Sequence, residues 1–374
     1  MTSLAEYRVM VDNRLQQSIA SSNWLEAAVP AEFCSEFLDP AQSLLAHGKR
    51  TRAAFLAAGW QLFTPNTEFS AVVDAKSDKS GKSRSTHAIL PVTAGTAVEL
   101  YQASALIHDD IIDAALSRRG LPATHIAFTN THETAELTGD AAKFGLNSAI
   151  LLGDLLLSLA ALTFAQAEHT SNEGFAVATT LFHRMTAEVA YGQYLDNRRE
   201  FTAFSQEFDA DIAQAYRVLY HKSARYSVDC PLKIGAALAG ATQEEIAQLS
   251  AIGIPLGEAF QLRDDQLGVF GDESATGKPS GGDLIEGKRT VLLGLTRKMA
   301  DPDEQQFLDA HIGKPLSAAE ITQIRQIIKS CGADAAHEAM ITEREQQASQ
   351  AIERLPQQSE ILQELFTQLS ARIA

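Results

Sequence analysis

The chain has 374 residues, is 45% hydrophobic and 21% charged, and carries a net charge of −16, so it can bury a large core. This charge argues against a broad nucleic-acid or anionic-membrane surface, although it allows a local basic pocket. Three widely separated cysteines, Cys34, Cys230 and Cys331, suggest neither a disulfide framework nor a zinc site. Because no apolar run reaches transmembrane length and the N-terminus lacks an apolar leader, we predict a soluble, cytoplasmic protein.

The apolar pattern predicts an all-α protein. Apolar residues recur at three- and four-residue spacing, and strand signals are sparse. We expect residues 1–374 to form one large helical domain, near the upper size for a single core. Helices are expected from about residue 3 to 62, with breaks around 28–30 and 46–48. Residues 64–91 follow, and their Ser-, Lys-, Asp- and Gly-rich middle predicts a mobile surface loop.

Further breaks are predicted later in the chain, at the polar stretches 169–174 and 271–283. Beyond them, Ser317 and Glu320 form a capping-box pattern at the start of a helix with isoleucines at helical spacing, which Gly332 can close. We assign this helix to packing and give it no chemistry.

A short acidic pattern occurs twice, as DDIID at residues 109–113 and as DDQLG at residues 264–268. Each copy follows an apolar helical run, and on a helix Asp109 and Asp113 share a face. Carboxylates within one turn repel one another, and burying them without partners is costly. A solvated acidic face would explain one such motif. Two copies at the ends of apolar helices favour a hard cation such as Mg²⁺, which prefers oxygen ligands and phosphate.

Basic residues accompany the acidic clusters, in predicted loops or at helix ends. Arginine forks match phosphate oxygens and stay charged. In an acidic protein, this set predicts two bound anionic groups, one bridged by metal and one held by arginine and lysine alone. The basic residues are Lys49, Arg50, Arg52, Arg118, Arg119, Lys222, Lys278 and Lys288.

These motifs, taken in order, resemble those of the trans-isoprenyl diphosphate synthases, the polyprenyl synthetase family, and most of all the bacterial geranylgeranyl diphosphate synthases. The resemblance implies an all-α isoprenoid-synthase bundle with a central hydrophobic cavity, commonly a homodimer. It extends from about residue 48 to 290. The matching segments are GKRTR, LIHDDIIDAALSRRG, FGLNSAILLGDLLL, GQYLD, KSA, FQLRDDQLGVFGD and TGKPSGGDLIEGKRT.

The resemblance also implies a metal site with three Mg²⁺ ions. Asp109 and Asp113 are expected to bind Mg²⁺ directly, with Asp110 in support. Asp264 is expected to bind the third ion from the opposite side, with Asp265 behind it.

Two diphosphate sites follow from the same resemblance. The allylic substrate, dimethylallyl, geranyl or farnesyl diphosphate, is expected at Arg118, Lys222 and Lys278, with Gln193, Asp196, Gln261 and Lys288 nearby. Isopentenyl diphosphate is expected at Lys49, Arg52 and Arg119, with Gln102 in the same pocket.

The implied reaction is ionisation of the allylic diphosphate followed by condensation. Metal and cationic side chains would stabilise charge on the departing diphosphate, and the released diphosphate would accept the proton. No protein general base is then required. The catalytic residues implied are Asp109, Asp113, Arg118, Lys222, Asp264 and Lys278.

Three positions depart from the family pattern. His47 stands for a glycine and Ala53 for a proline, from which we expect only local loop changes. Gly268 stands for the last aspartate of the second motif, from which we expect weaker metal support with retained activity. Asp272 is a candidate for partial replacement.

The resemblance implies that residues before the first motif form the floor of the hydrocarbon pocket and so set the product length. Ala105 and Ser104, four and five residues before Asp109, are small, and the next bulky residue is Tyr101, about 5 Å lower. That depth favours a twenty-carbon product, geranylgeranyl diphosphate. The alternatives are that another helix forms the floor, or that the product is farnesyl or a longer polyprenyl diphosphate.

Other functions compete with this interpretation. A terpene cyclase or head-to-head condensing enzyme would not need Lys49, Arg52 and Arg119. A non-catalytic regulatory subunit of another synthase should have lost its first motif or its arginines, and only Gly268 supports it. An acidic helical binding protein without chemistry would leave the ordered motifs unexplained.

Overall fold

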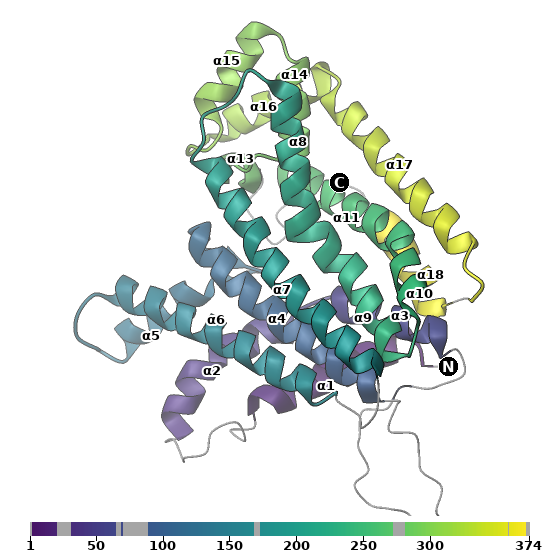
Figure 1. The fold of residues 1–374 in the computed structure, drawn as a ribbon. Helices are drawn as coiled ribbons and strands as arrows, with labels where there is room; N and C mark the ends of the chain where they lie inside the picture. The colour runs from purple at the N-terminus through teal and green to yellow at the C-terminus, as the bar shows by residue number, and fades with distance from the viewer. Residues whose placement is uncertain are drawn as a thin grey trace, which may run out of the picture. The chain divides into compact units, whose positions relative to one another are not determined.

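The computed structural model describes residues 2–20, 31–64, 69, 89–167, 173–271, 281–357 and 359–371. The described regular structure is helical, apart from a two-stranded hairpin of β1 (Ser117–Arg118) and β2 (Leu121–Pro122) (Figure 1). The all-α prediction is therefore confirmed.

Contacts group the chain into two compact units of interleaved segments. Unit 1 comprises residues 1–182, 231–247 and 357–365, and unit 2 comprises residues 183–230, 248–356 and 366–374. The prediction of one domain with a central cavity stays a prediction.

Unit 1 is built around the apolar helix α4 (Leu90–Ile112), whose residues from Leu90 to Tyr101 are all buried. This helix packs against α1, α3 and α6, and Figure 1 shows α6 running beside it. The other main helices of the unit are α1 (Leu4–Ala20), α2 (Ala31–Ala46), α3 (Thr51–Phe63), α5 (Thr124–Thr134), α6 (Ala141–Ala165), and most of α9 (Cys230–Leu238), α10 (Gln243–Gln248) and α18 (Glu360–Ser370).

The segment expected to be a loop over 64–91 is partly ordered against this core. Helix α4 already begins at Leu90, and Phe69 is buried, with its ring centroid 5.0 Å from that of Tyr7 and 5.2 Å from that of Trp60. The expected end of the loop is thus corrected, because Leu90 and Pro91 are core residues. Residues 65–68 and 70–88 lie outside the described part of the chain.

Helix α6 differs from α4 in exposing a row of apolar side chains. Leu151 is 60% exposed and Leu162 is 49% exposed, while Leu152 and Leu156 are buried. With 25 residues, this helix is long and apolar enough to cross a membrane by length and composition alone, which the sequence reading overlooked. Core helices of soluble proteins also pass that test, and α6 packs against both α4 and α5. The absence of a transmembrane segment stays a prediction.

Unit 2 contains the second aspartate motif on α11, which packs against a π-helical segment and α17. The predicted capping box between Ser317 and Glu320 is confirmed, and it begins α16. Gly332 follows this helix at φ 83°, a left-handed conformation that glycine adopts without strain. The elements of the unit are α7 (Glu173–Glu200) from residue 183 onward, α8 (Phe208–Val218), the π-helix η3 (Leu219–Asp229), α11 (Ser250–Phe270), α13 (Gly282–Glu286), α14 (Val291–Met299), α15 (Pro302–His311), α16 (Ala318–Ser330) and α17 (Ala333–Glu353).

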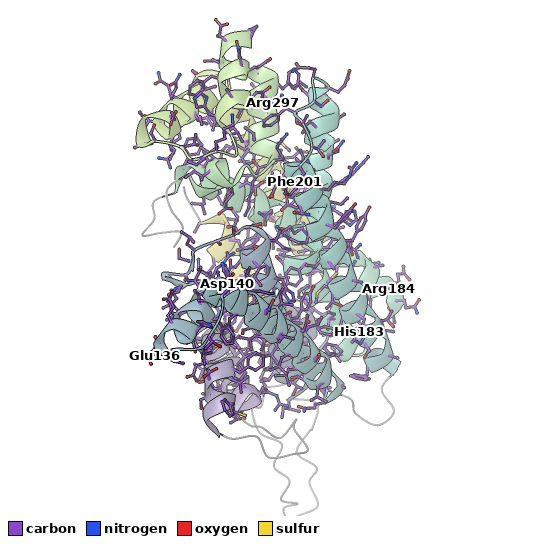
Figure 2. All side chains as sticks on the ribbon, turned by 90° about the vertical axis from the view of Figure 1, so that its left-hand side faces the viewer. Glu136, Asp140, His183, Arg184, Phe201 and Arg297 are labelled. Atoms are coloured by element: carbon purple, nitrogen blue, oxygen red, sulfur yellow. The ribbon has the colours of Figure 1, made fainter. Side chains whose placement is uncertain are left out.

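A buried arginine ties several of these elements together. Arg297 on α14, labelled in Figure 2, is 1% exposed. Its Nε donates to Asp309 Oδ1 at 2.7 Å, and its Nη1 donates to Asp211 Oδ2 at 3.3 Å. The guanidinium also lies over the ring of Phe204, 4.0 Å from its centroid. These contacts join α14 to α8 and α15, and we assign Arg297 to the fold.

Candidate active site

The first aspartate motif ends helix α4. Asp109 and Asp110 lie in its last turn, and Asp113 is the C-cap residue. Negative charge is unfavourable at a helix C-terminus, where the backbone carbonyls already concentrate partial negative charge. Asp110 is also 1% exposed. This arrangement of carboxylates therefore requires a cationic partner.

Arg118 on β1 supplies that charge. Its Nε donates to Asp110 Oδ1 at 2.8 Å, and its Nη2 donates to Asp110 Oδ1 and, at 3.3 Å, to Asp109 Oδ2. Burial opposes the charge of Arg118, but the hydrogen bond to Asp110 and the charges of the three aspartates raise the pKa of the guanidinium. The tight turn at Arg119 (φ 56°) and Gly120 (φ 77°) joins β1 to β2 and follows Arg118 directly.

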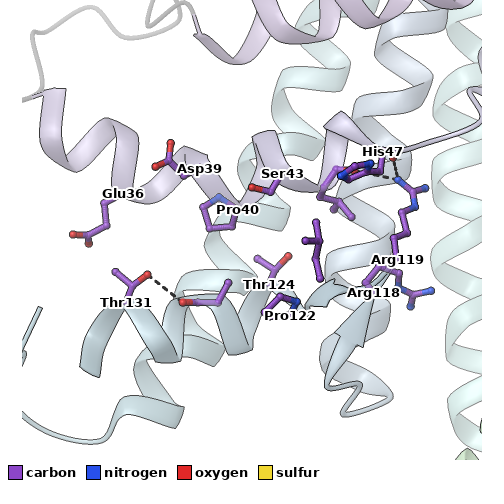
Figure 3. Close-up of a pocket in the computed structure, with 13 residues that line it drawn as sticks. Glu36, Asp39, Pro40, Ser43, His47, Arg118, Arg119, Pro122, Thr124 and Thr131 are labelled. Carbon is purple, nitrogen blue, oxygen red and sulfur yellow. Dashed lines mark hydrogen bonds between the residues drawn. The ribbon is translucent and has the colours of Figure 1, made fainter. Parts of the chain in front are cut away.

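Arg119 points away from the aspartates, toward the end of α2. Its Nη1 donates to the carbonyl oxygen of Leu44 at 3.1 Å. It also donates to the carbonyl oxygen of His47, and Figure 3 shows Arg119 beside His47. Burial lowers the pKa of Arg119. The negative charge of Glu99 raises this pKa, and the positive charges of Arg50, Arg118 and Arg52 lower it. Three other arginines thus lie within electrostatic reach of Arg119, and such a concentration of positive charge favours a bound anion.

Lys49 and Gln102 complete the group expected to hold isopentenyl diphosphate. Lys49 is exposed, and Arg52 at the start of α3 is half-buried, as is Gln102 on α4. Arg52 lies within electrostatic reach of Arg119, while the contact of either residue with substrate stays a prediction.

A cavity of about 400 Å³ lies beside this group, between α2 and α5 (Figure 3). Pro40 and Ser43 line it from α2, and Thr124 and Thr131 line it from α5. Arg118 and Arg119 both line it, whereas Lys49, Arg52 and Gln102 are not among its lining residues. The cavity therefore includes two of the predicted diphosphate ligands and leaves out the other three residues expected at isopentenyl diphosphate.

The sequence analysis did not identify the ion pairs of the buried Arg50, which hold the GKRTR segment against α1 and α4. Arg50 adopts a left-handed conformation (φ 49°) and is 4% exposed. Its Nε donates to Asp12 at 2.5 Å, and its Nη1 lies 3.9 Å from Glu99 Oε2. Glu99 Oε1 accepts a hydrogen bond from the backbone N–H of Ala53 at 3.1 Å. A lone acidic residue in the apolar run VELYQASALIH was the signal that could have identified Glu99.

The residues expected to set product length lie along α4. Tyr101 is 6% exposed and Ser104 is 1% exposed, while Ala105 is half-buried. Tyr101 and Ala105 are four residues apart and therefore share a face. Burial raises the pKa of Tyr101, and the charge of Arg52 acts in the opposite direction, so the ring lies within electrostatic reach of α3. Their role as a tunnel floor stays a prediction.

The second aspartate motif lies on α11 in unit 2. Gln261 Nε2 donates to Asp265 Oδ1 at 2.8 Å, which fixes the orientation of a carboxylate that is only 8% exposed. Burial raises the pKa of Asp265 well above its usual range, and the negative charges of Asp283, Asp264 and Asp196 raise it further. Such a crowded group of carboxylates would be stabilised by a cation.

Basic residues of unit 2 pair with acids near this motif. Lys222 Nζ on η3 donates to Asp196 Oδ2 on α7 at 2.7 Å. Gly192 permits this approach, because a Cβ there would overlap the backbone of Lys222. Lys288 Nζ lies 2.9 Å from Glu286 Oε2. Gln193 is half-buried on α7, and both Lys278 and Asp272 lie outside the described residues.

The two motifs fit magnesium by their donor chemistry. Within the ranges that the structure describes, no three His, Cys, Asp or Glu side chains converge as ready metal ligands. In unit 1 the Asp109 and Asp110 carboxylates instead bind the guanidinium of Arg118, and in unit 2 the acids crowd around Asp265. Both clusters offer carboxylate oxygens, which suit Mg²⁺ shared with phosphate. Because the motifs belong to different units, their facing arrangement stays a prediction.

Comparisons with known proteins agree with these motifs. The polyprenyl synthetase family model matches residues 34–330. A geranylgeranyl diphosphate synthase of Sulfolobus acidocaldarius is 33% identical over 248 residues, 65% of this chain and 68% of the relative. A geranylfarnesyl diphosphate synthase of Aeropyrum pernix is 31% identical over 246 residues, 65% of this chain and 69% of the relative.

A solved structure is similar over almost the whole chain. It is a geranylgeranyl pyrophosphate synthase from Corynebacterium glutamicum, complexed with isoprenyl diphosphate and magnesium. It is 31% identical, with a TM-score of 0.86 and 98% of each chain covered. The resemblance inferred from the sequence motifs is confirmed, and the chain belongs to the polyprenyl synthetase family.

Proposed function

We propose that this protein is a magnesium-dependent head-to-tail prenyltransferase that condenses isopentenyl diphosphate with an allylic diphosphate. The observation that carries the proposal is the position of Arg118, which binds the first aspartate motif on one side of a tight turn. On the other side of that turn, Arg119 donates to the carbonyl oxygens of Leu44 and His47 and lies within electrostatic reach of Arg52. The turn that follows Arg118 therefore separates a carboxylate cluster suited to a metal ion from a basic group suited to an anion.

One set of residues would bind the allylic diphosphate with Mg²⁺, and a second set would bind isopentenyl diphosphate. Asp109, Asp113 and Asp264 would hold Mg²⁺, which when bound stabilises charge on the departing diphosphate. Arg118 and Lys222 each contact a carboxylate, and each would exchange it for oxygens of the allylic diphosphate. This exchange keeps each cation paired before and after substrate binds.

The incoming isopentenyl diphosphate is assigned to Lys49, Arg52 and Arg119. These cations hold its diphosphate by hydrogen bonds and charge, which orients the double bond toward the allylic carbon. No protein base is assigned, since the released diphosphate can accept the proton. The condensation then needs only positioning and electrostatic stabilisation from the protein.

We propose geranylgeranyl diphosphate as the product. The small side chains of Ser104 and Ala105 leave room above Tyr101 for a chain longer than fifteen carbons. Relatives named as geranylgeranyl and geranylfarnesyl synthases support a product of this order. Farnesyl and longer polyprenyl diphosphates are the alternatives.

We also propose that the enzyme is a cytoplasmic homodimer. The support for a homodimer is the set of exposed apolar side chains on α6, which are Leu146, Ile150 and Leu157 in one row and Leu151 and Leu162 in another. Burial of such a row against a second copy would stabilise the dimer through the hydrophobic effect. Helix α4 is less suited to this role, because its side chains are already buried within unit 1.

One assay series tests the proposal against its rivals. Purified protein is incubated with isopentenyl diphosphate and each of the C5, C10 and C15 allylic diphosphates, with and without Mg²⁺. A synthase elongates at least one primer only with Mg²⁺. Conversion of an allylic diphosphate alone to a cyclic hydrocarbon would indicate a cyclase. No turnover with any primer would favour a regulatory subunit and would contradict the proposal.

A further inference from the structure

Asp283 holds an unexpected position beside the second aspartate motif. It lies in the first turn of α13, a five-residue helix that begins after Gly281 and packs against α11. Asp283 is 8% exposed, and its carboxylate is close enough to Asp265 to affect that residue electrostatically. Asp283 is therefore an acidic group aimed at α11 and largely removed from solvent.

The contact on α11 falls at Gly268. This glycine stands one turn after Asp264, on the same face of the helix. A Cβ built on Gly268 would overlap the carboxylate of Asp283. The space that a side chain at position 268 would enter is therefore filled by the carboxylate of Asp283.

We propose that Asp283 supplies the carboxylate that Gly268 lacks, as a positioning residue for the cation held by Asp264. The inference rests on the proposed function and extends it to a residue of the last matching segment that had no assigned role. A carboxylate one turn from Asp264 can accept hydrogen bonds from water on a Mg²⁺ ion, which usually keeps several waters. The third carboxylate of the second motif thus comes from Asp283, fifteen positions after Gly268 in the chain.

A purely structural role for Asp283 makes a different prediction. An acid in the first turn of a helix stabilises that helix through its dipole. In that case its removal would lower stability and leave magnesium affinity unchanged. The two roles therefore separate in a binding measurement that accompanies a melting curve.

The test uses reciprocal variants of the full-length protein. Magnesium-dependent binding of inorganic diphosphate is measured by calorimetry, and the melting temperature is measured without Mg²⁺. For Asp283→Ala we expect about tenfold weaker binding, as for other residues that support metal ligands. Adding Gly268→Asp to this variant should bring binding back to within about threefold of wild type, because the carboxylate returns from α11. Asp303→Ala, an exposed acid in the first turn of α15, is the control and should bind like wild type.

Two results would overturn the inference. One is wild-type affinity in Asp283→Ala, and the other is a double variant no better than that single variant. Should Asp283→Ala lose its native circular dichroism, Asp283→Asn, which keeps the shape and removes the charge, must show the same tenfold loss. Wild-type protein that neither binds diphosphate with Mg²⁺ nor elongates a primer would instead contradict the proposed function itself.

Discussion

Glu99 accepts a hydrogen bond from the backbone N–H of Ala53 at 3.1 Å, and so ties the buried core of α4 to the first turn of α3. Its other carboxylate oxygen lies 3.9 Å from Arg50, which also binds Asp12 on α1. The segment that carries Lys49 and the first turn of α3 with Arg52 is thus bound by a buried acid. Glu99 would position this loop through Ala53 and Arg50, and its negative charge also raises the pKa of Arg119.

Glu99→Ala should therefore weaken isopentenyl diphosphate binding selectively. We expect a loss of about 1–3 kcal/mol in the free energy of unfolding, since Ala53 N–H and Arg50 lose a buried partner. We also expect a higher KM for isopentenyl diphosphate with an unchanged KM for the allylic primer. Glu99→Gln keeps an acceptor for Ala53 and should show the smaller effect on both quantities. Equal changes in the two KM values would contradict the positioning role.

Removal of Arg118 should lower the free energy of unfolding, and Mg²⁺ should restore part of the loss. In Arg118→Ala, Asp110 stays buried without its guanidinium partner, which we expect to cost about 3 kcal/mol of stability. Millimolar Mg²⁺ should recover part of this loss by supplying charge to the same carboxylates. Urea unfolding with and without Mg²⁺ measures the effect.

Arg119→Ala is the matched control for that experiment. Arg119 donates to the carbonyl oxygens of Leu44 and His47, whereas Arg118 donates to the carboxylates of Asp109 and Asp110. Any loss of stability in this variant should not be recovered by Mg²⁺. Recovery in both variants would mean that magnesium acts elsewhere in the protein.

Tyr101 should limit product length if it forms the tunnel floor. Tyr101→Ala should shift the product beyond twenty carbons, at a cost of about 3 kcal/mol in stability because the ring is buried. Tyr101→Phe keeps the ring and should leave the product unchanged. Product length is read by chromatography after dephosphorylation. An unchanged distribution in Tyr101→Ala would show that another helix forms the floor.

His337 should make the protein less stable in acid. It is 0% exposed on α17, and within the described residues neither ring nitrogen has a hydrogen-bond partner. Burial lowers the pKa of His337 from 6.5 to about 4. The unfolded chain thus binds the proton more readily, and stability contributed by the neutral ring falls as pH drops from 6.5 toward 4. At about 1.4 kcal/mol per pKa unit, the loss approaches 3 kcal/mol.

His337→Leu should flatten this pH dependence. It removes two buried polar atoms, so we expect about 1–2 kcal/mol of added stability at pH 7. Urea unfolding at pH 4.5 and pH 7 compares the variant with wild type. A less stable variant with the same difference between the two pH values would contradict the assignment of the acid sensitivity to His337.

The features that the sequence predicted correctly are those determined by nearby residues. The capping box of Ser317 and Glu320 spans three positions, and the first aspartate motif requires only a helix over residues 90–112. The features that the sequence did not predict depend on contacts between helices that are separated in the chain. The carboxylate of Asp283 meets Gly268 only because α13 packs against α11, and Asp272, the nearer candidate in sequence, lies outside the described residues.

Surface exposure was equally difficult to predict from sequence. The helices α4 and α6 are both strongly apolar, yet α4 is buried while α6 presents Leu151 to solvent. Their amino-acid composition does not distinguish them, because the difference arises from which neighbours each helix contacts. The same holds for Arg50 and Arg119, which are both basic loop residues in sequence. Only their hydrogen bonds separate an anchor from a candidate ligand.

The most direct test of the proposed function is the stoichiometry of condensation. Carbon-labelled isopentenyl diphosphate is incubated with farnesyl diphosphate and Mg²⁺, and both released diphosphate and labelled product are counted. A head-to-tail synthase that forms geranylgeranyl diphosphate releases one diphosphate for each isopentenyl unit incorporated, gives a twenty-carbon product, and does neither without Mg²⁺. Diphosphate release without incorporation of label, or no release with any allylic primer, would contradict the assignment.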